Sequence, residues 1–555
     1  MNKDNKLILE ENITGFKYKK NLSNLNVSFN RTAFIFFAFL IVFILYSSKI
    51  VFLSNLEINL KKNLSSKSEF RSNIVDRNGK IIAKTVITKN IGINPPDIID
   101  KSKLILNLKI IFPDKDYIKI SEKINKGKFF YLEKNVSRKN YKKLFLLGDK
   151  SIKEEPKISR IYPNGALFSH ILGQIDDNNN GISGLEKSFD YELKTTKNDL
   201  KLSLDSDIQY LIREELIASS EIFRNIGAAS ILLDVNTGEI ISMVSVPDFD
   251  LNKRENIVDK NLINRATKGV YEFGSVFKTF TFTAGLNEEI IDVDTPFENL
   301  EKNISCAGNN IGEYDNKIPT DLTAEEILIR SGNIGSVRIG QKLGIDKYSS
   351  FLNIIGITSK INFDIEETGN PIPFKWGKCK LATSSFGHGI TTTLLQLSKA
   401  YAVISNGGYL IEPTLIRNKK LNKENYKRVL NKEVSDKVNK VLRKIVSTKE
   451  GTAGFANVKG YEVAGKTGTA QKSENGKYTN KKVNTFVSVF PYSKPKFTLL
   501  VLLDEPEANQ EYIYTFRDGT NFKYKGNNRN TAGWTSVEIA GKIIEKIGPI
   551  LATKY

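Results

Sequence analysis

Three short motifs follow one another in the C-terminal half of the chain: residues 275–278 (Ser-Val-Phe-Lys), 331–333 (Ser-Gly-Asn) and 466–469 (Lys-Thr-Gly-Thr). They offer a serine hydroxyl as a nucleophile, lysine amines that can take its proton, and polar groups that can bind an anionic peptide end. The chain has two histidines in total, so a Ser-His-Asp triad is nearly excluded. The combination predicts a serine acyltransferase that works without histidine.

The first two patterns are weak signals by themselves, because the chain is rich in serine and lysine. Residues 493–496 also fit Ser-x-x-Lys, but Pro495 would interrupt the helical turn that the pattern needs. Residues 28–30 also fit Ser-x-Asn, but they precede the predicted membrane segment. Lys-Thr-Gly occurs once. The order of the motifs and their surroundings therefore indicate a site more strongly than any single motif does.

The first motif can supply a nucleophile and its base. On a helix, Ser275 and Lys278 lie on one face, and the positive end of the helix stabilises negative charge on the hydroxyl. Lys278 can accept a proton only when it is neutral. Burial, together with Lys466 brought close by folding, would lower its pKa. The alternative interpretation is a solvated helix lysine, which is the usual case for Ser-x-x-Lys.

The second motif would add a hydroxyl that shuttles a proton, Ser331, and an amide that binds a substrate carbonyl, Asn333. Serine and asparagine also favour helix caps, and a cap after residues 328–330 explains the same pattern. Both interpretations are open at this point.

The third motif is predicted to lie on an edge strand and to bind the substrate. Lys466, Thr467 and Thr469 place one cation and two hydroxyls together, which suits a carboxylate. Gly468 would let a substrate backbone approach and pair as an added strand. The backbone N–H groups of Ser275 and Thr469 are the candidate oxyanion donors. The predicted substrate is a peptide with a free C-terminal carboxylate, attacked at its last amide.

These residues need a scaffold, and the 555-residue chain is long enough for more than one domain. From about residue 200, strand-like and helix-like stretches alternate in a way that predicts an α+β fold, a five-stranded antiparallel sheet with an inserted helical block. The predicted strands are 229–234, 239–244, 461–465, 485–490 and 497–503, and the predicted helices include 324–343 and 393–403.

Residues 32–53 form an apolar stretch long enough to cross a ~30 Å hydrocarbon core. The stretch is too long for a cleaved signal peptide and no cleavage site follows, so a single membrane anchor is predicted. Residues 1–31 would be a cytoplasmic tail, 54–200 an N-terminal pedestal domain and 201–555 the transferase domain. The lysines and arginines balance on both sides of the span, so the orientation is inferred from the short tail and from chemistry that needs the outer face.

The net charge of +20 comes mostly from lysines spread along the whole chain, without a basic stripe interleaved with aromatic residues, and no nucleic-acid partner is predicted. Cys306 and Cys379 lack metal-ligand spacing, and with two histidines no metal or other cofactor is predicted. Whether the two cysteines form a disulfide is open, since an oxidising compartment would permit it but no sequence feature places them close together.

Taken with their surroundings, the motifs resemble the class B penicillin-binding proteins, the monofunctional D,D-transpeptidases of the bacterial cell wall. Three positions depart from the family pattern: Phe273 where proline is usual, Ser72 where glycine is usual, and His388 where glutamine is common. The structural interpretation of His388, a loop residue that shapes the cleft wall, is favoured over an acid–base role. Further residues that carry the resemblance are 71–79, 160–163, His170, Gly173, 181–190, 271–275 and 385–390.

The resemblance implies a penicillin-binding-protein/serine β-lactamase-like domain behind an elongated pedestal and a single membrane helix. It implies a septal, FtsI-type enzyme that cross-links stem peptides ending in D-Ala-D-Ala, is acylated by β-lactams at Ser275, and works with a glycan polymerase of the FtsW type and other divisome proteins. It places the N-terminus in the cytoplasm and the catalytic domain in the periplasm. The alternatives are an elongation-type enzyme, a D,D-carboxypeptidase or β-lactamase that uses water, and a β-lactam sensor or scaffold.

Overall fold

The computed structural model describes residues 33–51, 70–253, 258–306, 308–418, 421–474 and 476–555. Residues 1–69 and 70–555 form two units. In the first unit Ala33–Val51 is one helix with a mean hydropathy of 2.4, long and apolar enough to cross a membrane. This helix fits the single-pass anchor predicted for residues 32–53. The tail predicted for residues 1–31 lies outside the described residues.

The main sheet of residues 70–555 consists of five antiparallel strands in the order β14-β15-β16-β6-β7. The two strands β16 and β6 lie inside the sheet and are almost wholly buried, which explains their continuous apolar sequences. The predicted five-stranded sheet is therefore confirmed. Its strands are β6 (Gly227–Asp234), β7 (Ile240–Val246), β14 (Ala464–Glu474), β15 (Lys477–Phe490) and β16 (Phe497–Asp504).

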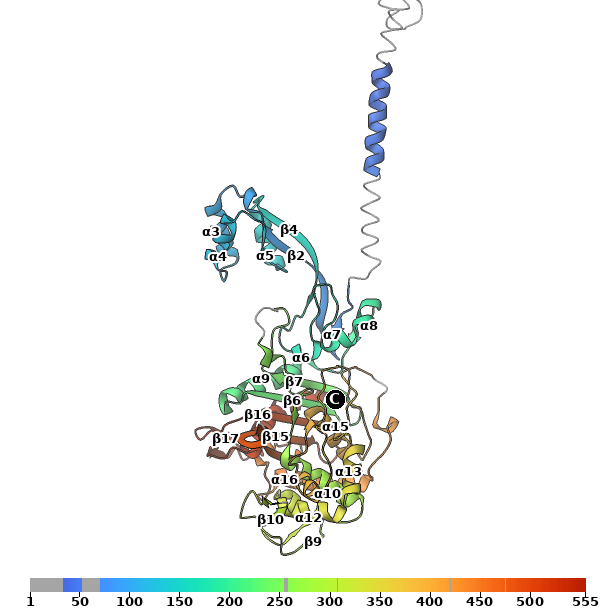
Figure 1. Ribbon diagram of the computed structural model, residues 1–555, viewed down its shortest axis with the longest axis vertical. Helices are drawn as coiled ribbons and strands as arrows, with labels where there is room; N and C mark the ends of the chain where they lie inside the picture. The colour runs from blue at the N-terminus through green and yellow to red at the C-terminus, as the bar shows by residue number, and fades with distance from the viewer. Residues whose placement is uncertain (1–32, 52–69, 254–257, 307, 419–420, 475) are drawn as a thin grey trace, which may run out of the picture. The chain divides into compact units, whose positions relative to one another are not determined.

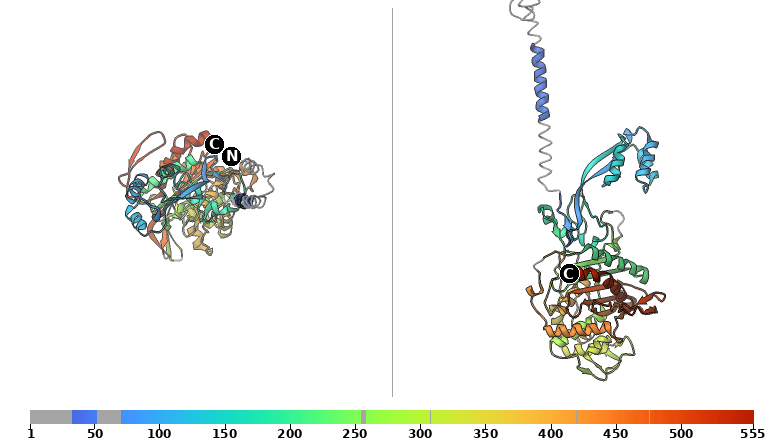
Figure 2. Two further views of the ribbon diagram at one scale, coloured as in Figure 1. Left: turned by 90° about the horizontal axis from the view of Figure 1, so that it is seen from above. Right: turned by 180° about the vertical axis from the view of Figure 1, so that it is seen from behind.

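Helices cover both faces of this sheet (Figures 1 and 2). Helices α9 (Ser206–Phe223) and α17 (Ser536–Lys554) pack together against β7, β6 and β16. Helix α15 (Leu394–Ser405) contacts β16 and β6, and α16 (Lys432–Ser447) contacts β14. The inserted helical block continues from α16 through α10 (Lys278–Asn287) to α12 (Asn333–Leu343) and α13 (Ile345–Ile354). The predicted α+β arrangement is confirmed.

The prediction of one continuous helix over residues 324–343 is wrong. Helix α11 (Ala324–Ile329) ends before Ser331, which adopts a left-handed backbone conformation with φ of 58°, and α12 begins at Asn333. That conformation costs a non-glycine residue roughly 1–2 kcal/mol. The helix-cap interpretation of residues 331–333 allowed for such a break, and the hydrogen bonds that Ser331 accepts at it come from distant segments.

Residues 70–200 contain a long antiparallel pair, β2 (Ile81–Ile93) and β4 (Ile152–Ile161). The helices α3 (Lys101–Ile111), α4 (Tyr117–Asn125) and α5 (Arg138–Leu146) contribute to a separate apolar core at one end of this pair (Figure 1). At the other end, β1 (Ile74–Val75) pairs with β2 and with β5 (Leu200–Lys201). Asp76 holds the turn between β1 and β2, since its Oδ1 accepts the N–H groups of Asn78 and Lys80, both at 2.9 Å.

A buried ion network ties together the family-like segments of the pedestal. Glu186 accepts from Arg71 Nε at 2.8 Å and from Arg160 Nε at 2.7 Å, and all three side chains are inaccessible to solvent. Arg71 also pairs with Asp190 at 2.5 Å. Removal of one partner from such a network leaves an uncompensated buried charge, which costs about 3–5 kcal/mol. The network therefore holds the segments around residues 71, 160 and 186–190 together within residues 70–200.

Cys306 and Cys379 form a disulfide with their Cα atoms 5.5 Å apart. The bond joins the hairpin of β10 (Asn303–Cys306) and β11 (Asn309–Gly312) to α14 (Lys378–Ser384). The pairing left open by the sequence is thus made in the structure, between two segments 73 residues apart in the chain.

Candidate active site

Ser275 lies in the tight helical turn η3 (Gly274–Phe277), which runs directly into α10 at Lys278. In such a turn residues three apart lie above one another. Ser275 is half-buried and within reach of solvent, while Lys278 is 1% exposed. Buried Tyr401, from α15, donates its hydroxyl to the Val276 carbonyl at 2.9 Å and fixes the turn. The nucleophile candidate is therefore held at the surface and its base candidate beneath it.

The three motifs meet at the hydroxyl of Ser331. Lys278 Nζ donates to Ser331 O at 2.5 Å, to Ser331 Oγ at 3.2 Å and to Asn333 Oδ1 at 2.7 Å. Lys466 Nζ donates to the same Ser331 Oγ at 2.9 Å and to Thr467 O at 3.0 Å. Helix α11 ends at Ile329 and α12 begins at Asn333, so the motif also lies at a helix boundary, as the helix-cap interpretation expects.

Burial dominates the electrostatics of this cluster. It lowers the pKa of Lys278 to about 7, although the nearby Glu313 carboxylate acts in the opposite direction. The pKa of Lys466 is lowered well below its ordinary value, first by burial and then by the charge of Lys278. Two ammonium groups that bond to the same hydroxyl repel each other strongly, because the buried surroundings screen charge poorly. At neutral pH the cluster therefore holds a neutral lysine amine next to the nucleophile's turn.

The third motif lies on β14, at the edge of the sheet as predicted. Thr467 Oγ1 and Thr452 Oγ1 share a hydrogen bond of 2.7 Å. Thr469 Oγ1 accepts the N–H of Ala532 at 2.9 Å, so the hydroxyl hydrogen of Thr469 is free to be donated. A free hydroxyl donor close to a lysine cluster is suited to a carboxylate.

Gly468 has a packing role that the sequence did not reveal. A Cβ at this position would lie 2.2 Å from Phe273 O and 2.5 Å from Val276 Cγ2, both in the nucleophile's own turn. Gly274 meets the same strand from the other side, because a Cβ there would lie 2.6 Å from Thr469 O. The two glycines allow β14 and η3 to touch.

We expect Gly468→Ala to displace η3 from β14. The protein should lose about 1–3 kcal/mol of unfolding free energy, and the Ser275 hydroxyl should react more slowly with an acylating reagent, because it moves relative to β14. Denaturant unfolding and acylation rates measure the two effects. The control is Gly377→Ala, since a Cβ at Gly377 meets no atom within 4 Å. A Gly468→Ala variant as stable and as reactive as this control would contradict the packing argument.

His388 lies in an aromatic stack. Its ring is 4.2 Å from that of Tyr478 and 5.9 Å from that of Phe386, and burial lowers its pKa. Tyr478 OH donates to Glu272 Oε1 at 3.1 Å, and the Gly389 N–H donates to Glu272 Oε2 at 2.9 Å. These contacts tie the 385–390 loop to the segment before Ser275. They agree with the interpretation of His388 as a residue that shapes the wall of the site.

Glu313 is absent from the residues that the sequence singled out. Its carboxylate accepts the N–H groups of Asn333 at 2.7 Å and of Ile334 at 2.9 Å. It lies twenty residues before Asn333 in an irregular segment, and no spacing or periodicity distinguishes it from other surface glutamates. Only the folded structure places it next to the second motif.

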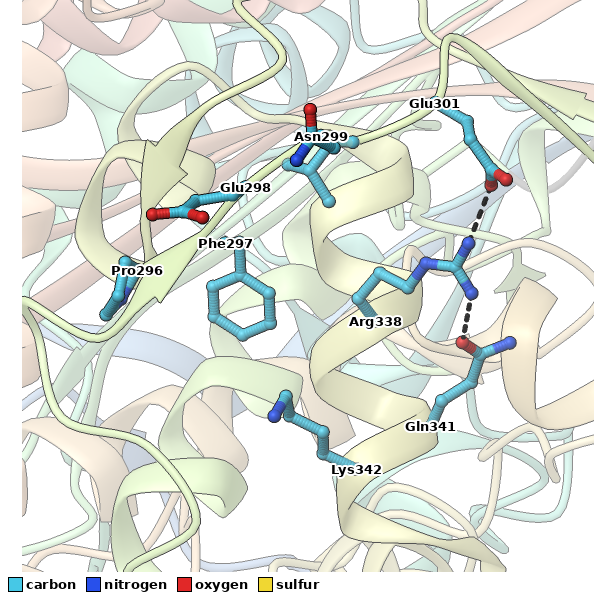
Figure 3. A pocket seen from close by; sticks show the side chains of 9 residues that line it. Pro296, Phe297, Glu298, Asn299, Glu301, Arg338, Gln341 and Lys342 are labelled. Carbon is cyan, nitrogen blue, oxygen red and sulfur yellow. Dashed lines mark hydrogen bonds and ion pairs between the residues drawn. The ribbon is translucent and has the colours of Figure 1, made fainter.

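A separate pocket of about 550 Å³ lies further along α12 (Figure 3). Arg338, which pairs with Glu301 at 2.6 Å, forms part of its wall, together with Phe297 and Lys342. None of the residues of the three motifs lines this pocket. The candidate site is therefore the cluster around Ser331 and the adjoining edge of β14.

The sequence matches the penicillin-binding protein transpeptidase domain over residues 228–516 and the penicillin-binding protein dimerisation domain over residues 67–215. It is 31% identical to the peptidoglycan D,D-transpeptidase FtsI of Buchnera aphidicola, covering 90% of this chain and 94% of that protein. It is 28% identical to the probable peptidoglycan D,D-transpeptidase FtsI of Caulobacter vibrioides, covering 87% of this chain and 82% of that protein.

The fold is similar to a crystal structure of penicillin-binding protein 3 from Mycobacterium tuberculosis in complex with aztreonam. The TM-score is 0.65 at 22% identity, and the match covers 86% of this chain and 96% of the other. At that identity the likeness concerns the fold alone.

Proposed function

The chain belongs to the penicillin-binding protein transpeptidases, and from that premise we propose that it cross-links peptidoglycan stem peptides in septal wall synthesis through a serine acyl-enzyme. The observation that carries this proposal is the meeting of two buried lysine amines, Lys278 and Lys466, on the Ser331 hydroxyl. Ser275, Lys278, Ser331, Asn333 and Lys466 are the catalytic residues in this mechanism.

In the acylation step Ser275 Oγ attacks the carbonyl carbon of the D-Ala-D-Ala amide. Lys278, neutral near pH 7, takes the hydroxyl proton. Ser331 accepts hydrogen bonds from both lysines, so its own hydrogen is free to pass to the departing amine of D-Ala. The C–N bond breaks, an ester forms on Ser275, and the proton lost by Ser331 is replaced from Lys278.

In the second step the amine of a neighbouring stem peptide attacks this ester, and the same groups return the proton to Ser275. The backbone N–H groups of Ser275 and Thr469 are the proposed oxyanion donors, each worth ~3 kcal/mol. Thr467 and Thr469, with the Lys466 amine as a further hydrogen-bond donor, bind the terminal carboxylate. The edge of β14 at Gly468 pairs with the substrate backbone, and Asn333 holds the substrate amide.

We further propose that the rest of the chain holds the catalytic domain at the cell wall. In our proposal residues 1–31 are a cytoplasmic tail, 32–53 a single membrane span, 54–200 a pedestal and 201–555 the transpeptidase domain in the periplasm. Glycan strands come from a membrane polymerase of the FtsW type, which the pedestal and other divisome proteins help to recruit. β-Lactams, which resemble D-Ala-D-Ala, acylate Ser275.

A comparison of two acceptors tests the reaction class. The full chain in detergent is incubated with a stem peptide ending in D-Ala-D-Ala, with and without a labelled D-amino acid. We expect the label to enter the peptide in place of the terminal D-Ala faster than water releases the shortened peptide. Hydrolysis without exchange would contradict a transpeptidase and favour a D,D-carboxypeptidase.

A further inference from the structure

Glu313 lies immediately after β11 and is joined to the N-terminus of α12. Its Oε2 accepts the Asn333 N–H at 2.7 Å and its Oε1 accepts the Ile334 N–H at 2.9 Å. Helix α12 has 11 residues, and its N-cap residue, Gly332, provides no side-chain cap. The distant Glu313 carboxylate provides one instead. The negative charge also favours that end of the helix dipole.

The same segment orients the Asn333 side chain. Asn333 Nδ2 donates to the carbonyl of Gly312, the residue before Glu313, at 2.7 Å. Its Oδ1 accepts from Lys278 Nζ at 2.7 Å. A rotated amide would set its oxygen against a carbonyl and its NH₂ against an amine, losing both hydrogen bonds. Gly312 and Glu313 therefore determine which atom of Asn333 faces Lys278.

Glu313 also sets the charge around Lys278. The titratable groups that face Lys278 are Lys466 from β14, Glu313, and Tyr314, whose ring centre is 6.0 Å from Lys278 Nζ. Burial, with smaller contributions from Asp315 and Glu313, raises the pKa of Tyr314 to about 12, so its phenol is neutral. Glu313 therefore supplies a negative charge that favours the ammonium form of Lys278, against the effect of burial.

The segment that carries Glu313 is anchored on two sides. The disulfide of Cys306 holds the β10–β11 hairpin to α14. Tyr314 OH donates to the Arg330 carbonyl, just before Ser331, at 2.9 Å. A carboxylate held in this way can keep Asn333 in place without contacting a substrate itself.

We propose that Glu313 is a positioning residue of the acyl-transfer site, which holds the Asn333 amide on Lys278 and keeps a negative charge beside that amine. This inference rests on the proposed serine acyl-transfer reaction. A simple structural cap of α12 would affect stability alone, whereas a positioning residue also changes the pH dependence of the reaction.

The test compares Glu313→Gln and Glu313→Asp with wild type in the full chain in detergent. The readouts are the unfolding midpoint and the rate of acylation by a fluorescent penicillin between pH 5.5 and 9. Glu325→Gln is the matched control, because it removes a carboxylate from the first turn of the neighbouring helix α11, where Glu325 pairs with exposed Lys444 at 2.8 Å.

We expect Glu313→Gln to slow acylation by on the order of 10- to 100-fold, since a displacement of about 1 Å in a reacting group has an effect of that size. Loss of the negative charge should also move the rising limb of the pH profile to lower pH. Glu313→Asp keeps the charge but has a shorter side chain. The pH at which its acylation rate rises should therefore stay near that of wild type, while the rate itself falls. Glu325→Gln should match wild type in both the acylation rate and its pH dependence.

The inference would be overturned if the acylation rate of a folded Glu313→Gln variant rose at the same pH as that of wild type, or if Glu313→Asp reacted at the wild-type rate. If Glu313→Gln fails to fold, the rate of Glu313→Asp decides by itself. The two proposals fail separately: a wild-type protein that never reacts with penicillin refutes the serine mechanism, whereas a reactive wild type with indifferent Glu313 variants refutes only the role of Glu313.

Discussion

Ser275→Ala is expected to abolish covalent labelling by penicillin, with a loss of at least about 10⁴-fold in acylation rate, because no other group can form the ester. Binding of the antibiotic should persist in weakened form, since the Lys466 and Thr469 groups remain. Ser275 is half-buried at the start of a turn that Tyr401 fixes independently, so the free energy of unfolding should change little. Gel fluorescence of the labelled full chain measures the effect.

The chain contains a matched control for this experiment. Ser493 and Lys496 have the same Ser-x-x-Lys spacing, but they lie between β15 and β16, where Ser493 donates to Glu462 and Lys496 contacts the Tyr555 carbonyl. Ser493→Ala should label as wild type does. Labelling that survives in Ser275→Ala, or disappears in Ser493→Ala, would contradict the assignment of the nucleophile.

Lys278→Met is expected to reduce the acylation rate by roughly 10²–10⁴-fold, the usual contribution of a positioned general base. The pH dependence of wild type follows from the same group. At an unshifted pKa of 10.5, about one lysine in 3,000 would be neutral at pH 7, whereas at a pKa of about 7 about half are. The rate should therefore rise as pH increases through about 7 and level off above it.

The measurement is the acylation rate of both proteins across this pH range. Lys342→Met is the control, since Lys342 is an exposed lysine on α12 that lines the separate pocket. If the wild-type rate keeps rising toward pH 10, the amine is not neutral near pH 7 and the proposed proton transfer is wrong. An acylation rate of Lys278→Met equal to that of Lys342→Met would also contradict the proposed proton transfer.

The sequence predicted those parts of the fold that depend on local pattern. The strands β6 and β16 are buried inside the sheet, and their unbroken apolar runs made them recognisable. The turn between β6 and β7 has the sequence Asn-Thr-Gly, which is typical of a tight turn, and Gly238 there has a positive φ of 79°. The helix predicted over 393–403 begins one residue later, because Thr393 forms its capping box with Gln396.

The features that the sequence did not reveal all depend on contacts between distant segments. Lys278 and Lys466 bond to Ser331 at the break between α11 and α12, and neither lies near it in the chain. Gly468 is required by the approach of Phe273, almost 200 residues earlier. Glu313 and the Cys306–Cys379 disulfide likewise act across the fold. Motif spacing predicted the reacting groups, while their support could be found only in the structure.

The most direct test of this account is to locate the covalent adduct in the wild-type protein. The full chain is incubated with penicillin at pH 7.5, digested and analysed by mass spectrometry for the peptide that carries the added antibiotic. We predict a single ester on the peptide that contains Ser275, absent after prior treatment with an unlabelled cephem. An adduct on another residue, or none after prolonged incubation of folded protein, would contradict the mechanism.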